Sequence, residues 1–396
     1  MRVFTITKEQ LFLALLFFLA SILTFTFYNP SRLVDTKAYQ IREAFPPLVF
    51  LPGYQQGPPV YASAGVLIES KSGAVLFAKN PDLRRAPAST TKMMTAIVAL
   101  EKGNLNKIVK VSHLAANTPG SSIWLRAGDK LPLKELLEGM MLQSGNDGSM
   151  AVAEGVAGGV EQFVRLMNMK AKEIGALNTN FRNPHGLRAP SHYTTALDLA
   201  LIARYGLANP RFAALVKQKT AIINWVEKRR NLLVNNTNRL LWHLEGADGV
   251  KTGTTSEAGY CLVASATRDG RQLIAVVLNS GDRWGDCARL LEYGFKEFVA
   301  IKIATHQRSV ASLPVRGGNF SSINLYPRSD LVAVVRKGDQ HLVKPQITLL
   351  SEFGVAPIRP GRVWGKIGYH YLAKPVEGVD LINLQAVPAK RKWWPW

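Results

Sequence analysis

The apolar positions along the chain follow three successive patterns, and each pattern predicts a different kind of element. Two short apolar stretches in residues 64–80 flank a Lys-Ser-Gly turn, which predicts a β-hairpin. In residues 131–142 and 195–207 the apolar residues recur at helical spacing, which predicts helices. In residues 260–279 two apolar runs flank an Asp-Gly turn, a strong hairpin signal, and residues 288–299 have the pattern of an amphipathic helix.

The order of these elements predicts an α+β fold. Strands at both ends with helices between them favour one antiparallel sheet, flanked by helices and completed by two distant parts of the chain, with an α-helical lobe inserted. Beyond residue 303, short apolar runs alternate with Gly and Pro turns up to about Val387. This second pattern predicts a small all-β domain after the first.

The N-terminal segment predicts export. Leu11–Tyr28 carries no charged residue, follows Arg2 and Lys8, and is long enough to span a bilayer, as in a signal peptide or a membrane anchor. No clear cleavage site follows it, so its removal stays open. We divide the chain into a signal peptide or anchor (1–30), a Pro- and Gly-rich linker (31–60), a main domain (61–303), a small β-rich domain (304–387) and a basic, aromatic tail (388–396).

The amount and distribution of charge limit the classes of partner that the chain is expected to bind. The formal net charge is +21, which attracts polyanions, but the Lys and Arg residues are scattered and no nucleic-acid-binding motif is present. Anionic lipid or an acidic wall polymer explains the charge as well, and we expect no nucleic-acid partner. The tail combines three cations with three tryptophans and fits either a membrane interface or a frayed end. Cys261 and Cys287 either pair after export or are two small buried side chains.

A serine and a lysine stand three residues apart in the stretch "APASTTKMMTA". Ser89 before an apolar run has the position of a helix N-cap, and Lys92 alone would be a solvated side chain. The spacing also places both on one helix face, which a serine nucleophile with a lysine base requires. Burial among apolar residues would lower the pKa of Lys92 and make it a base.

Two further motifs favour the catalytic interpretation. Ser144-Gly145-Asn146 follows the helix predicted at 131–142, and Lys251-Thr252-Gly253 lies on a predicted strand before the hairpin. The set SxxK, SxN and KTG, in this order, is the signature of penicillin-binding proteins and class A β-lactamases. The seven histidines show no zinc-peptidase spacing, so we expect no metal and no cofactor.

The motifs, with "NPHGL", "NNTNRLL" and "DGVKTGTTSEAGYCLVASA", resemble the serine-type D-alanyl-D-alanine carboxypeptidases, the low-molecular-mass penicillin-binding proteins of bacterial cell walls. The resemblance implies the penicillin-binding-protein/β-lactamase-like transpeptidase fold, followed by that family's small C-terminal domain. It implies an exported enzyme at the outer face of the cytoplasmic membrane, held there by its N-terminal segment. Its substrates would be peptidoglycan stem peptides, from which it removes the terminal D-Ala, and β-lactam antibiotics would inhibit it.

The resemblance also implies a role for each motif residue. Ser89 would be the nucleophile and Lys92 its base, and Ser144 would relay a proton to the leaving amine. The backbone N–H groups of Ser89 and Thr254 would form an oxyanion hole. The remaining expected substrate-binding residues are Asn146, Lys251, Thr252, Gly253 and Thr254.

Two other functions and one residue stay open. A class A β-lactamase would need a Glu-x-x-Leu-Asn motif, whereas the sequence from Glu173 to Asn178 has one residue too many, so Glu173 is expected to be an ordinary helix residue. A non-catalytic, membrane-tethered penicillin sensor would not need Ser89 and Lys92 together. Relatives often carry a carboxylate-binding arginine after the hairpin, and either Arg283 or Asp286 occupies that place.

Overall fold

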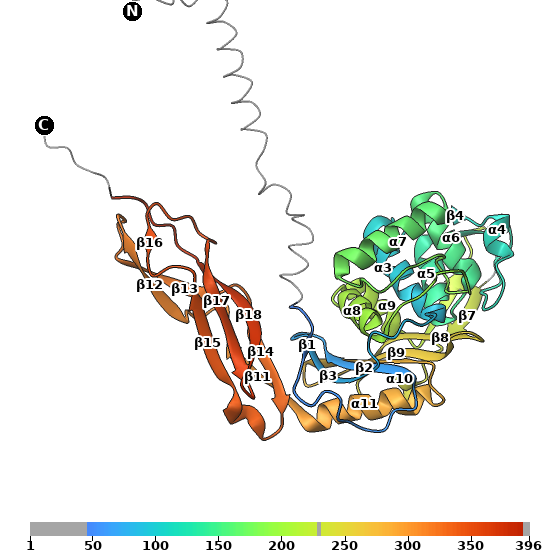
Figure 1. Cartoon of the computed structure of the whole chain (residues 1–396). Coiled ribbons are helices and arrows are strands. Elements are labelled where there is room, and N and C mark those ends of the chain that lie inside the picture. The colour runs from blue at the N-terminus through green and yellow to red at the C-terminus, as the bar shows by residue number, and fades with distance from the viewer. Residues whose placement is uncertain (1–45, 228–230, 391–396) are drawn as a thin grey trace, which may run out of the picture. The chain divides into compact units, whose positions relative to one another are not determined.

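The computed structural model describes residues 46–227 and 231–390 (Figure 1). The predicted export segment at 11–28, the first half of the predicted linker (31–45) and the end of the tail lie outside these ranges. Within the described part of the chain, no helix has both the length and the apolar character needed to cross a bilayer. The boundaries that we drew between domains stay predictions.

A six-stranded sheet forms the centre of the main domain, as predicted. Its order is β1-β3-β2-β10-β9-β8, and all neighbours are antiparallel except β1 and β3. The pairing of β10 with β2, for example Val276 opposite Val66, joins parts of the chain that are far apart in sequence. The strands are β1 (Val49–Phe50), β2 (Ala64–Glu69), β3 (Ala74–Lys79), β8 (Ala247–Thr255), β9 (Gly259–Arg268) and β10 (Arg271–Leu278).

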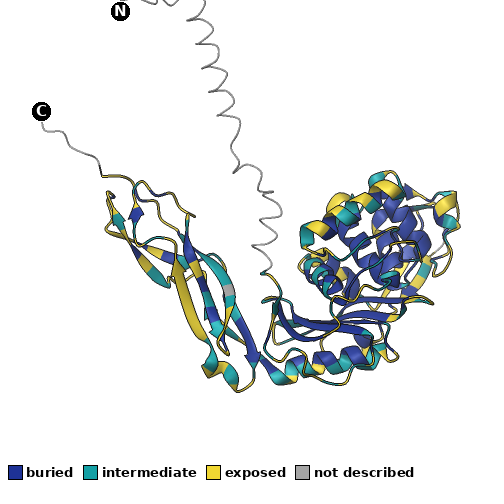
Figure 2. Cartoon of the chain, in the orientation of Figure 1, coloured by how far each residue is buried: buried dark blue, intermediate teal, exposed yellow. Residues whose placement is uncertain are grey.

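Helices cover both faces of this sheet, which explains why its strands are continuous apolar runs. On β2, Val66 and Ile68 belong to the core shared with the helical lobe, while Leu67 belongs to the core beneath α11 (Arg283–Glu297). A strand buried on both faces has no polar alternation. Figure 2 shows the buried colour along the sheet and through the centre of the helical lobe.

The helical lobe surrounds one central helix, α3 (Lys92–Lys102). Every residue from Lys92 to Ala99 is buried, because α5, α6, α7 and α8 all pack around α3. A helix covered on all sides must be apolar all round, so the single lysine in its first turn stands out. The other helices are α4 (His113–Ala116), α5 (Leu133–Leu142), α6 (Asn146–Ala157), α7 (Val160–Ile174), α8 (Ala196–Leu207), α9 (Pro210–Lys217) and α10 (Leu240–His243).

Two short antiparallel strand pairs border the lobe, and neither of them was predicted. The first pairs β4 (Ile108–Lys110) with β5 (Lys130–Pro132), and the second pairs β6 (Thr220–Asn224) with β7 (Asn231–Asn235). β6 and β7 have five residues each, and their exposed face includes the apolar residues Ile222 and Leu233, so polar and apolar positions do not alternate clearly.

The C-terminal part is all-β, as predicted. β11 (Phe298–Ala304) pairs with β14 (Leu331–Arg336), and a second sheet has the order β15-β17-β18-β13-β12-β16. Trp364, Ile367 and Leu381 are buried in its core. The strands of the second sheet are β12 (Ala311–Arg316), β13 (Ser322–Pro327), β15 (Lys344–Leu349), β16 (Gly354–Val355), β17 (Val363–Tyr371) and β18 (Lys374–Asn383).

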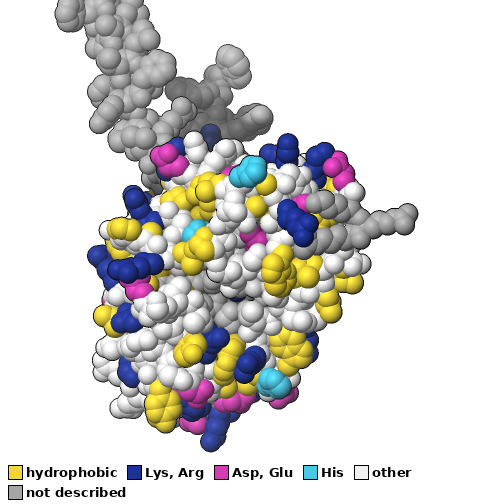
Figure 3. Space-filling model, turned by 90° about the vertical axis from the view of Figure 1, so that its right-hand side faces the viewer, with side chains coloured by type: hydrophobic (Ala, Val, Ile, Leu, Met, Phe, Trp, Pro, Cys, Tyr) yellow, Lys and Arg dark blue, Asp and Glu magenta, His cyan; other side chains and the backbone are white. Residues whose placement is uncertain are grey.

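The surface agrees with the scattered distribution of charge in the sequence. On the face shown in Figure 3, Lys and Arg side chains lie among acidic, hydrophobic and neutral ones and do not gather into one basic stripe. Cys261 and Cys287 are both buried and both free, in agreement with the interpretation as two small buried side chains.

Candidate active site

Ser89 lies in a turn of 3₁₀-helix, η2 (Ala88–Thr91), which leads directly into α3. The interpretation of Ser89 as an N-cap is therefore wrong: α3 begins at Lys92, and its cap residue is Thr91, whose side chain makes no capping bond. Ala88 has a φ of +48°, a left-handed conformation that is rare for a residue with a Cβ. The strained turn sets the direction of the Ser89 side chain, and strain of this kind is typical of functional sites.

The Lys92 ammonium group is held by three oxygen atoms. Its Nζ donates to Ser89 Oγ at 2.9 Å, to Asn146 Oδ1 at 2.7 Å and to the carbonyl oxygen of His185 at 2.8 Å. The three acceptors match the three protons of the ammonium form, whereas the neutral amine has two protons and a lone pair that can accept the Ser89 hydroxyl proton. One residue thus joins the SxxK helix, the SxN segment and the loop after α7.

The surroundings of Lys92 favour its neutral form. The side chain is fully buried, and burial lowers the pKa of Lys92 well below its ordinary value. The charge of Lys251 lowers the same pKa further, while Asp147 raises it. A lysine can accept a proton near neutral pH only when its pKa is lowered in this way.

The SxN segment is the connection between α5 and α6. Ser144 is buried and has a φ of +66°, and Asn146 begins α6. Asn146 Nδ2 donates to the carbonyl oxygen of Pro119 at 2.7 Å, which orients its Oδ1 toward Lys92. The next residue, Asp147, accepts bonds from the backbone N–H groups of Ile123 and Leu125. These bonds fasten the neighbouring loop to the start of α6.

The KTG residues lie on β8, at the edge of the central sheet. A Cβ at Gly253 would lie 3.0 Å from the carbonyl oxygen of Pro87 and 3.2 Å from the nitrogen of Ser89. The backbone of β8 can therefore approach the serine turn closely only with glycine at this position. Thr252 Oγ1 lies 2.7 Å from Thr237 Oγ1, and Thr254 is exposed beside the serine turn.

Lys251 is a buried cation without a partner. Its side chain is 1% exposed, and within the described ranges its Nζ makes no hydrogen bond. Burial and, to a smaller extent, the charge of Arg283 lower the pKa of Lys251 to about 7. A buried ammonium group without an acceptor is unfavourable, so a site that keeps one is suited to an anionic ligand.

This arrangement predicts a stability effect of Lys251→Met. The pKa of Lys251 falls from 10.5 in the unfolded chain to about 7 in the fold, so between these values the unfolded chain binds more protons. The free energy of unfolding should therefore rise with pH across this window. We expect Lys251→Met to raise the Tm by roughly 5 °C at pH 7, with the difference from wild type shrinking toward pH 10.5. Melting curves of wild type and Lys251→Met between pH 7 and 10.5 test this prediction, with the exposed Lys110→Met as control. A Tm difference that does not change with pH would contradict a lowered pKa of Lys251 in the fold.

The structure distinguishes Arg283 from Asp286. Arg283 Nη1 donates to Thr254 Oγ1 at 2.8 Å and to the carbonyl oxygen of Gly253 at 3.1 Å, so its guanidinium group lies at the end of the KTG strand. The Asp286 carboxylate is fully buried and accepts the backbone N–H groups of Tyr61 and Ala62. Arg283 therefore faces the site, and Asp286 fastens the chain before β2.

Three contributors to the site had no clear signal in the sequence. The His185 carbonyl oxygen binds Lys92, while the His185 imidazole Nδ1 accepts the N–H of Leu187 and shapes its loop. Thr91 Oγ1 lies 3.1 Å from His192 Nε2, which ties η2 to the same region. Thr237, within the segment "NNTNRLL", contacts Thr252 of the KTG motif through its hydroxyl group. Backbone acceptors and side chains on irregular loops follow no sequence period, so only the fold reveals them.

Glu173 has the ordinary role that its sequence context predicted. It lies near the end of α7, and its Oε2 is 2.7 Å from Nζ of Lys170, which also contacts Glu101 at 2.8 Å. A carboxylate engaged in a structural ion pair is not placed to activate a water molecule at an acyl-serine.

Comparison with known proteins agrees with this geometry. Residues 54–282 match the family model described as D-alanyl-D-alanine carboxypeptidase, and residues 298–389 match that of the penicillin-binding protein 5 C-terminal domain. The chain is 37% identical to the D-alanyl-D-alanine carboxypeptidase DacF of Bacillus subtilis over 317 residues, covering 77% of this chain and 80% of that one. It is 35% identical to DacC of Escherichia coli over 348 residues, covering 84% and 86%.

A solved structure gives the same result for the fold. Penicillin-binding protein 5 from Haemophilus influenzae is similar with a TM-score of 0.76 and 32% sequence identity, over 84% of this chain and 99% of that one. The predicted transpeptidase-like fold with a small β domain is thereby confirmed. A family model that covers more than half of the chain, together with these relatives, decides the classification: the chain belongs to the D-alanyl-D-alanine carboxypeptidase family of serine peptidases.

Proposed function

We propose that the chain is a serine D,D-carboxypeptidase that removes the terminal D-Ala from peptidoglycan stem peptides. The observation that carries the proposal is the 2.9 Å hydrogen bond between Lys92 Nζ and Ser89 Oγ, inside a buried site where the Lys92 pKa is lowered. The unpartnered ammonium group of Lys251 beside it provides a place for a carboxylate. Family membership supports the same substrate class.

In the acylation step, Ser89 Oγ attacks the carbonyl carbon of the penultimate D-Ala while its proton passes to neutral Lys92. The carbonyl oxygen becomes an oxyanion, which the backbone N–H groups of Ser89 and Thr254 stabilise. The close approach of Gly253 to the Ser89 nitrogen supports this pairing of backbones. Asn146 holds the substrate amide, a role supported by its hydrogen bond to the same Lys92 Nζ that contacts Ser89 Oγ.

In the next step the C–N bond breaks and D-Ala leaves. Its nitrogen takes the proton, which Ser144 relays from Lys92. Water then attacks the acyl-serine ester, Lys92 again accepts a proton, and the Ser89 hydroxyl is restored. A β-lactam follows the same first step, but its amine stays attached to the acyl group, so the enzyme is held as the ester.

The terminal carboxylate of the substrate binds at the KTG strand. Lys251, Thr252 and Thr254 present one ammonium group and two hydroxyl groups there, and Arg283 adds a guanidinium group through its bond to Thr254. A fixed charge in a partly dry cleft binds a carboxylate more strongly than a solvated one does.

The carboxylate role predicts a selective defect of Lys251→Gln. We expect kcat/KM for a peptide ending in D-Ala-D-Ala to fall about 100-fold, in line with the loss of one charge-assisted hydrogen bond at a buried site. The same peptide with a C-terminal amide should lose much less, only as far as removal of the Lys251 charge raises the pKa of Lys92. Paired assays of D-Ala and D-alaninamide release measure this. An equal loss on acid and amide would remove Lys251 from carboxylate binding.

The same proposal places the enzyme outside the cytoplasm, at the outer face of the bacterial cytoplasmic membrane. The apolar segment 11–28 supports export, and the net charge of +21 fits an acidic wall or membrane surface. The mass of the mature protein shows whether the segment is retained as an anchor.

A further inference from the structure

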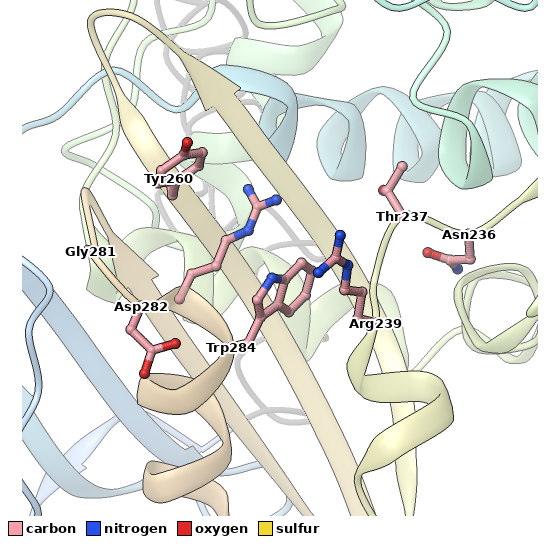
Figure 4. Close-up of a pocket in the computed structure, with 8 residues that line it drawn as sticks. Asn236, Thr237, Arg239, Tyr260, Gly281, Asp282 and Trp284 are labelled. Atoms are coloured by element: carbon pink, nitrogen blue, oxygen red, sulfur yellow. The ribbon is translucent and has the colours of Figure 1, made fainter.

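A pocket of about 540 Å³ lies beyond the end of the KTG strand (Figure 4). Its walls come from three separate elements: the loop before α10, the start of β9 and the start of α11. The side chains that line it include those of Thr237, Arg239, Tyr260, Asp282, Arg283 and Trp284.

The pocket begins where the leaving amino acid of the proposed reaction ends. Two of its wall residues touch the KTG hydroxyl groups directly: Arg283 Nη1 donates to Thr254 Oγ1 at 2.8 Å, and Thr237 Oγ1 lies 2.7 Å from Thr252 Oγ1. A D-Ala whose carboxylate reaches these hydroxyls would leave the pocket empty, because its side chain is a single methyl group.

The pocket carries positive charge that no neighbouring acid balances. Arg239 is exposed, and its guanidinium group makes no hydrogen bond or ion pair within 46–227 and 231–390. Among the described residues of the wall, Asp282 is the one acid. Its carboxylate accepts the N–H of Gly285 at 2.9 Å and lies 3.3 Å from Arg289. Arg239 and Arg283 both line this pocket, and burial lowers the pKa of Arg283, with the charge of Arg239 lowering it too.

Aromatic rings give the pocket fixed walls. The Arg283 guanidinium group lies 4.6 Å from the Trp284 ring and 5.3 Å from the Tyr260 ring, so its plane is held by stacking. Figure 4 shows Trp284 and Arg239 extending toward each other across the pocket, while the Asp282 carboxylate points away from them. The geometry suits an extended chain lying on the rings with an anionic group at Arg239.

We propose that this pocket is a subsite for the side chain of the leaving amino acid, and that it takes D-amino acids with an extended, anionic side chain. The inference rests on the proposed function and adds a substrate class to it. The reaction is unchanged. The acyl group that ends in D-Ala is transferred to Ser89 Oγ, the C–N bond breaks, and the nitrogen of the released amino acid takes the proton. Two sources present this chemistry, a free acidic C-terminal residue and a cross-link to the amino acid of a second stem peptide.

The test compares three N-acylated peptides that end in D-Ala-D-Ala, D-Ala-D-Glu and D-Ala-D-Gln. Glutamate and glutamine have the same size, so their kcat/KM ratio isolates the charge. We expect wild type to prefer D-Glu over D-Gln about fivefold, the scale of a partly exposed ion pair, and Arg239→Gln to bring the ratio close to 1. Arg211→Gln, an exposed arginine on α9 outside the pocket, should keep the wild-type ratio.

Three results would overturn the subsite. One is an equal Glu/Gln ratio in wild type and Arg239→Gln. The second is no hydrolysis of either longer peptide while D-Ala-D-Ala is cleaved. If wild type releases no D-Ala either, the proposed function fails and the subsite with it. A purified cross-linked muropeptide dimer separates the sources: Arg239-dependent cleavage supports cross-linked stems, and resistance of the dimer with D-Glu release retained supports free acidic residues.

Discussion

Ser89→Ala should abolish both D-Ala release and covalent labelling by penicillin. The loss should be on the order of 10⁴-fold or more in kcat, because Ser89 carries the hydroxyl group that is hydrogen-bonded to Lys92 Nζ. The folded structure should be unaffected, because the substitution removes only the hydroxyl oxygen that accepts the Lys92 hydrogen bond and adds no larger group. Release of D-Ala from a pentapeptide and a fluorescent-penicillin gel measure the two effects on one preparation.

The control for this variant is Ser312→Ala on β12, which removes the hydroxyl group of an exposed serine of the C-terminal sheet. Because Ser312 itself is exposed and lies outside the site, the variant should keep wild-type rates and labelling. Retained labelling of Ser89→Ala would mean that another residue is the nucleophile. Loss of labelling with retained D-Ala release would mean that peptide hydrolysis does not pass through this serine.

Lys92→Met should cause the second largest loss, about 10³-fold in the rate of acylation, as expected when a general base is removed. Methionine fills a similar volume, so the packing of α3 should survive. The variant leaves Asn146 Oδ1 and the His185 carbonyl oxygen without their donor, so its Tm should be measured beside its rate. The measurement is stopped-flow or quenched-flow acylation by a fluorescent penicillin.

The pH profile separates a base from a merely structural lysine. Because burial lowers the pKa of Lys92, the wild-type acylation rate should rise with pH until this lysine has lost its proton. Lys92→Met should lose that rise. Lys102→Met, at the exposed end of the same helix, should retain both the rate and the profile. An unchanged profile in Lys92→Met would exclude the lysine as the base.

The sequence was sufficient to predict the central sheet and the three motifs, because both depend on local patterns. Strands buried on two faces are continuous apolar runs, as at β9 and β10, and the Asp-Gly turn between them specifies a hairpin. The three-residue spacing of Ser89 and Lys92 also predicted their contact, since the turn of η2 and the first turn of α3 bring i and i+3 together.

Other parts of the site depend on tertiary packing and left no local pattern. The left-handed conformations of Ala88 and Ser144 are fixed by the elements around them and not by residue type. The pairing of Lys92 with the His185 carbonyl oxygen joins residues 93 positions apart. The choice between Arg283 and Asp286 required the direction of the first turn of α11, because both lie within it.

The most direct test of the account is peptide mapping of the penicillin-treated protein by mass spectrometry. Trypsin should release residues 86–92, "APASTTK", in which Ser89 is the single serine. If Ser89 is the nucleophile, this peptide gains the mass of one intact penicillin molecule, and fragmentation locates the added mass on Ser89. A penicillin adduct on Ser144 or on any other residue, or a protein that remains unmodified while it is folded, would contradict Ser89 as the nucleophile.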